Sequence, residues 1–416
     1  MCWIFVHVLF SISLVRSPNK KIAIACAVLF VAVYVFKPIT ADLPKYSSYF
    51  TTGYIAVHAF EDWNDEIVLD PRDLTGQPFD QAFRQKIWGN IYSGSGFAYF
   101  SKMLHATLPK GNLFPRILDR NWYIADFPIL AIMVLSLTIL IVAAGNLLSS
   151  TGIVQFAKKQ LIFTVPVIMG SVFYMLGSQS AIRQFLTMSL IFLALSFIRR
   201  KHHVSSIIIL VVAASIHNWA LAFALLSVPI VLILEKLKHS SRSSSRIFFE
   251  LCVATSGLIA GCLVVICIEL LLSPVGSGVA RLIGDFQLVS DLKIYVNLDY
   301  THLLGRTSAF FKLLLVGGIV IVSELILGNQ KIKEDFDIRS FRLAIFTFSI
   351  PLVIYPELFS RFLFFYFAAE MFFVISSFWA AEARVRLASA VIFIAYGIAP
   401  NAINVLAGTG WRNIFI

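Results

Sequence analysis

A succession of apolar runs, separated by short basic segments, is the feature that most constrains how this 416-residue chain folds. Hydrophobic residues make up 58% of the sequence, and charged residues only 14%. An ordinary soluble domain of this length does not have such a composition, so a bilayer must solvate most of the surface. The runs lie near 2–15, 22–36, 126–148, 161–177, 181–198, 248–273, 307–328, 342–355, 362–381 and 387–405, with a further stretch over 204–234.

The basic segments set the predicted orientation, because lysine and arginine beside membrane helices favour the cytoplasm. The stretch 204–234 is basic on both flanks and must therefore go out and return, with a bend near His217-Asn218. This gives an all-α, polytopic membrane protein with about twelve transmembrane helices and both termini outside. The first run has neither the basic start nor the cleavage site typical of a signal peptide, so we expect a retained helix. Six short loops are then inside, and they carry Arg16/Lys20/Lys21, Lys158/Lys159, Arg199/Arg200/Lys201, Lys236/Lys238/Arg242/Arg246, Lys331/Lys333/Arg339 and Arg384/Arg386.

The predicted organisation is one polytopic domain, residues 1–416, with two insertions on the outside. The first covers residues 38–125 and the second residues 274–306. A connection as long as the first is usually functional, so we expect it to contribute to the activity.

Charge and missing motifs exclude several function classes. The formal net charge of +11 lies largely in short loops between apolar runs, so topology explains it better than nucleic-acid binding. The five cysteines fall in apolar segments without paired spacing, which argues against disulfides and metal ligands. No nucleotide-binding or zinc-protease motif is present. We therefore expect no cofactor, no metal and no nucleic-acid partner.

Three arginines, Arg183, Arg306 and Arg361, share a placement that topology does not explain. Each lies at the predicted outside start of a helix that runs inward. Ser180 precedes the first and Ser360 the third, and both serines are able to cap a helix. Free N–H groups and partial positive charge at helix starts suit phosphate, and a guanidinium adds to this.

Gln184 follows Arg183 directly and strengthens the functional interpretation of that arginine. The alternative is structural: each of these cations extends to the headgroups or pairs with a carboxylate. For Arg183 with Gln184 we favour a binding site.

His217 and Asp42 are the candidate bases. His217 lies in an apolar run at the predicted outside bend, and Asp42 follows the second helix on the outside, with Tyr46 four residues later. The histidine pKa of ~6.5 is nearer neutrality than the ~3.9 of an aspartate, which slightly favours His217 as the base or as a direct ligand. Asp42 with Tyr46 is better placed to orient a sugar. Both groups also have structural alternatives, a carbonyl-bonded histidine and a solvated loop carboxylate.

These elements, in this order, resemble the EpsG-type branch of the Wzy-like polysaccharide polymerases. The resemblance covers most of the chain and depends on D-x-x-x-Y (Asp42, Tyr46), I-R-Q (182–184), a basic turn, A-x-x-x-H (Ala213, His217) and S-R-F-x-x-F-Y (360–366). That family often has a Glu-Pro-Gly-aromatic element in the first outside loop. Here the stretch reads Gly94-Ser95-Gly96-Phe97, so the role of the acid does not carry over.

The resemblance implies a GT-C-type glycosyltransferase in the bacterial cytoplasmic membrane, with its active site facing outside. It would join oligosaccharide repeat units carried on undecaprenyl pyrophosphate, with His217, Asp42 and Arg183 as catalytic residues. Gln184, Tyr46, Arg361 and Arg306 would bind substrate. The implied partners are the lipid-linked donor and acceptor, a chain-length regulator and a flippase.

Two other functions fit parts of the pattern. A flippase for the lipid-linked saccharide also needs cationic sites, and Glu269 and Glu324 lie deep enough in helices for a proton relay. Such a transporter usually has an internal repeat, which this sequence lacks. A membrane acyltransferase acting on the glycan, with His217 as base, is the third possibility.

Overall fold

The computed structural model describes residues 2–16, 19–38, 116–119, 122–124, 127–149, 153–179, 182–217, 219–240, 246–272, 303–328, 337–378 and 383–406. Nearly all of these residues are helical, which confirms the predicted fold class. The helices are α1 (Cys2–Arg16), α2 (Lys20–Val35), α7 (Phe127–Leu148), α8 (Ile153–Gly170), α9 (Val172–Gln179), α10 (Ile182–Arg199), α11 (His203–Ile216), α12 (Trp219–Ser240), α13 (Arg246–Leu272), α16 (Leu303–Leu327), α17 (Ile338–Ser349), the 3-10 helix η3 (Ile350–Ile354), α18 (Pro356–Phe378) and α19 (Ala383–Leu406).

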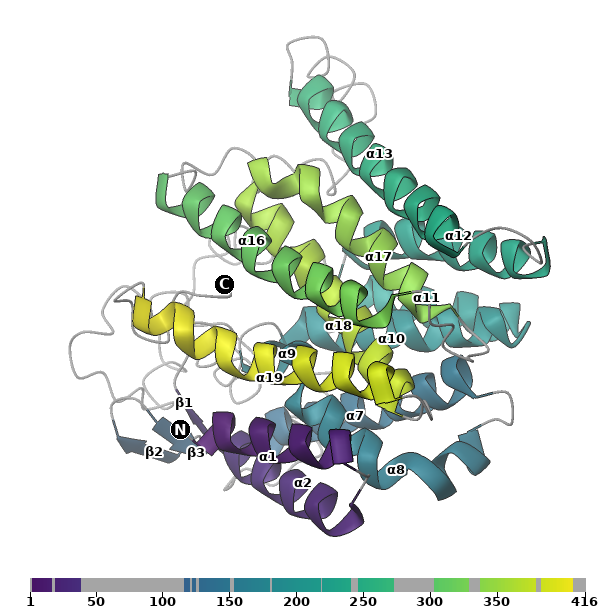
Figure 1. The fold of residues 1–416 in the computed structure, drawn as a ribbon. Helices are drawn as coiled ribbons and strands as arrows, with labels where there is room; N and C mark the ends of the chain where they lie inside the picture. The colour runs from purple at the N-terminus through teal and green to yellow at the C-terminus, as the bar shows by residue number, and fades with distance from the viewer. Residues whose placement is uncertain are drawn as a thin grey trace, which may run out of the picture.

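The helices stack side by side, with α1 and α2 at one edge of the bundle and α13 at the other (Figure 1). Six helices in the described part of the chain are long and apolar enough to cross a membrane: α7, α10, α12, α13, α16 and α18. The bent pair α8–α9 adds a seventh if it forms one span. The predicted number of about twelve spans stays a prediction.

Apolar side chains cover the outside of the bundle as well as its core. On α11, for example, Val204, Ile207, Ile208 and Val211 are all more than half exposed. The core itself is rich in phenylalanine, including Phe192, which stacks on Phe372 of α18. Lipid tails solvate apolar side chains as well as a protein core does, so a membrane protein can have an apolar exterior around a packed apolar core.

A small antiparallel sheet, which the sequence did not predict, lies at the two ends of the first insertion. Its strands are β1 (Phe36–Pro38), β2 (Arg116–Asp119) and β3 (Trp122–Ile124), with β3 in the centre. Phe36 pairs with Ile124, so the chain leaves α2 and returns to α7 at neighbouring points. The sheet therefore closes the insertion into a loop, whose interior, 39–115, lies outside the described residues.

The break between α8 and α9 bends the chain by 60° at Ser171. A break at membrane depth frees carbonyl groups, which must find donors within the protein. His7 Nε2 donates to the Gly170 carbonyl at 2.7 Å, and the Tyr34 hydroxyl donates to the Met169 carbonyl. Two side chains from α1 and α2 thus stabilise the bend, which leads the chain towards α10.

The basic turn after α10 has a structural role besides its predicted topological one. Arg199 donates to the carbonyls of Asn146 (2.9 Å) and Leu147, and Arg200 donates to those of Asn146 (3.2 Å) and Ser149. These carbonyls end α7, where an unsatisfied C-terminus favours positive charge. The two arginines therefore fix the end of α7 to the end of α10.

Helices α13 and α17 run parallel and pack closely through a Gly-x-x-x-Gly pair. A Cβ atom at Gly257 would lie 2.6 Å from the Ala344 carbonyl oxygen, and one at Gly261 would lie 2.3 Å from that of Phe348. Only glycine permits this approach, which is a common way for membrane helices to associate.

Candidate functional site

The ends of three segments that are distant in sequence meet at one place in the bundle. They are the start of α10, the turn between α11 and α12, and the start of α18. Gln184 is the third residue of α10 and Arg361 the sixth of α18. Arg361 Nη1 donates to Gln184 Oε1 at 3.4 Å, so the structure brings these two predicted site residues together.

Arg361 also contacts the turn and its own helix. Its guanidinium lies over the Trp219 ring, 5.8 Å from the ring centroid, and forms an ion pair with Glu357 at 2.9 Å. A planar guanidinium held by a carboxylate on one side and an aromatic face on the other has a defined orientation. Arg361 is therefore positioned, while its side chain remains 17% exposed.

His217 lies in the turn that the sequence predicted, between the end of α11 at Ile216 and the start of α12 at Trp219. Its burial lowers the pKa of the imidazole well below the ordinary 6.5, and the charges of Arg183 and Arg361 lower it further. The histidine is therefore neutral near pH 7, and it lies within electrostatic reach of both arginines.

A local hydrogen bond defines the tautomer of this neutral imidazole. The backbone N–H of Trp219 donates to His217 Nδ1 at 3.3 Å. An accepting Nδ1 carries no proton, so Nε2 carries it and is a donor. In this state the ring offers a hydrogen-bond donor rather than a base.

Lys312 is a residue of this region that the sequence analysis missed. It is the tenth residue of α16, is only 6% exposed, and donates from Nζ to Ser360 Oγ at 3.4 Å. The predicted capping role of Ser360 is wrong, because α18 begins four residues earlier, at Pro356. A lysine inside an apolar run was the only sequence signal for it.

The structure describes the remaining predicted residues only in part or not at all. Asp42 and Tyr46 lie outside the described residues, as do Ser180 and the stretch 94–97. Arg306 is the fourth residue of α16, within the helix start that the sequence predicted, and its side chain is not among those described.

A second group of charges lies further along α16 and α18 and also includes residues of α13 and α17. Arg339 and Arg342 of α17 pair with the following carboxylates: Glu250 of α13 (3.2 Å from Arg339), Glu324 of α16 (2.6 Å from Arg339) and Glu370 of α18 (2.6 Å from Arg342). Arg342 also pairs with Glu324. The sequence analysis assigned Arg339 to a basic loop, whereas it is 3% exposed and lies in the first turn of α17. This network connects four helices.

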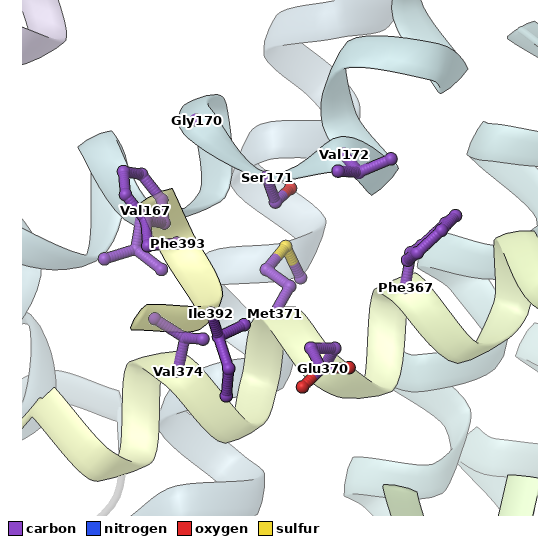
Figure 2. A pocket seen from close by; sticks show the side chains of 10 residues that line it. All are labelled: Val167, Gly170, Ser171, Val172, Phe367, Glu370, Met371, Val374, Ile392 and Phe393. Carbon is purple, nitrogen blue, oxygen red and sulfur yellow. The ribbon is translucent and has the colours of Figure 1, made fainter. Parts of the chain in front are cut away.

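A small pocket below the α8–α9 break reaches the second group of charges and not the first (Figure 2). Its lining is apolar except for Ser171 and Glu370, and consists of Val167, Gly170, Ser171, Val172, Phe367, Glu370, Met371, Val374, Ile392 and Phe393. None of the predicted site residues lines it.

Fold and site together define a polytopic helical membrane protein with cationic and hydrogen-bond-donating side chains gathered at one end of its bundle. The profile of the EpsG family matches residues 120–414, so the chain belongs to the EpsG family. This membership, which confirms the resemblance, supports a role of the polysaccharide-polymerase type in general. No curated protein and no solved structure matches the chain.

Proposed function

We propose that the chain is a membrane glycosyltransferase that joins lipid-pyrophosphate-linked oligosaccharide repeat units into a surface polysaccharide. The reaction takes place at the outer face of the cytoplasmic membrane. The observation that carries this proposal is the convergence of Arg361, Gln184 and His217 from separate helices, with Arg183 in electrostatic reach of the histidine. Membership of the EpsG family supports the polymerase class.

The proposed reaction requires groups that bind phosphate and stabilise negative charge, and these residues are of that kind. A hydroxyl of the acceptor unit attacks the anomeric carbon of the donor, the bond from that carbon to the phosphate oxygen breaks, and the lipid pyrophosphate departs with negative charge. Arginine binds phosphate oxygens through two parallel N–H groups, and it stabilises the departing group most as its charge develops. We assign this role to Arg183 and Arg361.

His217 donates a hydrogen bond to the same leaving group. Its neutral state and the proton on Nε2 favour this role over the slight preference for a base that the sequence suggested. The hydroxyl proton then goes to another group, for which Asp42 remains the candidate.

Variants at position 217 distinguish a hydrogen-bond donor from a general base. We expect His217→Gln, which keeps a neutral donor, to retain a measurable fraction of polymerisation, and His217→Leu to abolish it. Wild-type activity should not fall as the pH drops from 8 to 6.5, because the histidine is already neutral there. Equal loss in both variants, together with a rate that falls as the pH drops through 6.5, would restore the base role to His217.

The glycan profile of cells that lack the protein tests the function itself. A polymerase predicts loss of long chains while single repeat units are still transferred. A flippase predicts that lipid-linked units accumulate on the inner leaflet. The second outcome would contradict the proposal, and the second group of charges would then be a candidate for a transport path.

Purified protein in lipid vesicles gives the direct test. With a lipid-pyrophosphate-linked repeat unit as the only substrate, we expect a ladder of products that differ by one repeat and release of the lipid pyrophosphate. Absence of the ladder with correctly folded protein would exclude the proposed reaction.

A further inference from the structure

Packing alone does not explain why a lysine occupies position 312. Its side chain is 6% exposed and lies within an apolar span, where an ammonium group is costly to bury. The ammonium has three N–H donors, yet in the described part of the chain its one hydrogen bond is to Ser360 Oγ at 3.4 Å. A lysine with only a structural role would be expected to have its donors satisfied.

Glu357 is the carboxylate that acts as a partial counter-ion for Lys312. It pairs with Arg361 at 2.9 Å and also acts electrostatically on Lys312. Its side chain is 39% exposed, far more than that of Lys312. One partly exposed carboxylate therefore serves two cations.

Gln184 provides an independent observation at the same place. Its Oε1 accepts from Arg361, which fixes the orientation of the amide, since the nitrogen could not accept. Its Nε2 is buried and has no hydrogen-bond partner among the described residues. A buried amide donor without an acceptor costs free energy, so an acceptor from a ligand is expected there.

We propose that Lys312 is a third cation of the anion site, and that a phosphate group of the substrate displaces Glu357 when it binds. The incoming oxygens accept from the Lys312 ammonium, the Gln184 amide and the Arg361 guanidinium. Glu357 holds the two cations in place while the site is empty and moves into water afterwards. This inference rests on the proposed function, because the anion is taken to be the pyrophosphate of the lipid carrier.

Binding of inorganic pyrophosphate to the purified protein in nanodiscs of zwitterionic lipid tests the proposal. We expect Lys312→Met to weaken affinity by about tenfold or more, because one charge-assisted hydrogen bond contributes that much. Lys312→Arg should keep most of the affinity, and Glu357→Gln should increase it by removing a competing carboxylate. Lys21→Met, at an exposed position of α2, is the control and should bind like the wild type.

Thermal stability of the ligand-free protein gives a second measurement. Lys312→Met should unfold at a higher temperature than the wild type, since it removes a buried charge with few partners. A lower unfolding temperature with unchanged pyrophosphate affinity would make Lys312 structural and overturn the proposal.

The remaining outcomes separate this inference from the function. Loss of binding in Arg183→Ala and Arg361→Ala, with wild-type affinity in Lys312→Met and Glu357→Gln, would overturn the third cation and leave the function standing. No binding by the wild type would count against both. If Lys312→Met changed only the binding of anionic phospholipid in nanodiscs, the lysine would serve a headgroup and the proposal would be wrong.

Discussion

Removal of Arg342 should destabilise the protein more than most single substitutions. This side chain is fully buried and donates to Glu370 at 2.6 Å and to Ser323 at 3.2 Å, while its guanidinium lies 4.0 Å from the centre of the Phe373 ring. Removing one member of a buried ion pair typically costs about 3–5 kcal/mol, because the other charge stays buried. We expect Arg342→Met to cost this amount.

Most of this loss of stability should come from the Glu370 carboxylate. Glu324, the other carboxylate that pairs with Arg342, is 21% exposed and keeps its ion pair with Arg339 at 2.6 Å, so a second guanidinium still stabilises it. The Glu370 side chain is only 3% exposed and loses the guanidinium that neutralises it. A second substitution, Glu370→Leu, should therefore recover most of the loss, since apolar replacement of a whole buried pair is often neutral.

Unfolding titrations in mixed micelles, monitored by tryptophan fluorescence, give the free energies of the two single variants and the double variant. A cost below about 1 kcal/mol for Arg342→Met, or no recovery in the double variant, would refute this reasoning. Activity adds a second criterion. A structural network predicts that the double variant still makes long chains, whereas a proton relay through these carboxylates predicts that it is inactive.

Three further predictions concern packing, chemistry and topology. Gly261→Ala should lower stability by about 1–3 kcal/mol in the same titration because its Cβ would meet the Phe348 carbonyl, whereas Gly318→Ala, which has no atom within 4 Å, should be neutral or stabilising. Arg183→Lys should preserve expression but strongly reduce polymer length on glycan gels, because lysine lacks the fork that binds two phosphate oxygens; normal chains would remove its assigned role. Cysteines at positions 205 and 240, in a variant without native cysteines, should resist membrane-impermeant labels added outside intact cells; labelling of either would refute the predicted hairpin.

The sequence predicted the helical membrane fold from its composition, and the break at His217 from the basic segments on both flanks of the stretch 204–234. It also predicted that Arg361 and Gln184 belong to one site, since each lies near the start of an apolar run and the charge pattern places both starts on the same side. The predicted helix start at Ser360 was wrong by one helical turn, because α18 begins at Pro356, and proline is favoured at the first position of a helix.

The sequence could not predict the contacts of residues whose surroundings depend on how their helix is rotated about its own axis. Lys312 sits in an apolar run with no amphipathic period, so its sequence does not indicate whether it faces lipid, core or site. Arg342 posed the same difficulty: its charge was visible, but its partners come from α16 and α18, and only packing decides which faces meet.

The contrast between the two charge groups gives a reason to place substrate at one and not at the other. Arg361 and Glu370 are nine residues apart on α18, about 14 Å along the helix, so the groups are distinct. In the second group, the terminal nitrogens of Arg342 donate to two carboxylates and a hydroxyl, which stabilises its buried charge. In the first group, the Lys312 ammonium makes a single long hydrogen bond and the Gln184 amide nitrogen makes none in the described part of the chain. A low-dielectric environment penalises such unused donors, and an anionic ligand is what offsets that penalty. Lys312 and Arg361 of the first group share the partly exposed carboxylate of Glu357, whereas Arg339 and Arg342 of the second group pair with the carboxylates of Glu250, Glu324 and Glu370. This difference in charge balance favours the first group as the binding site.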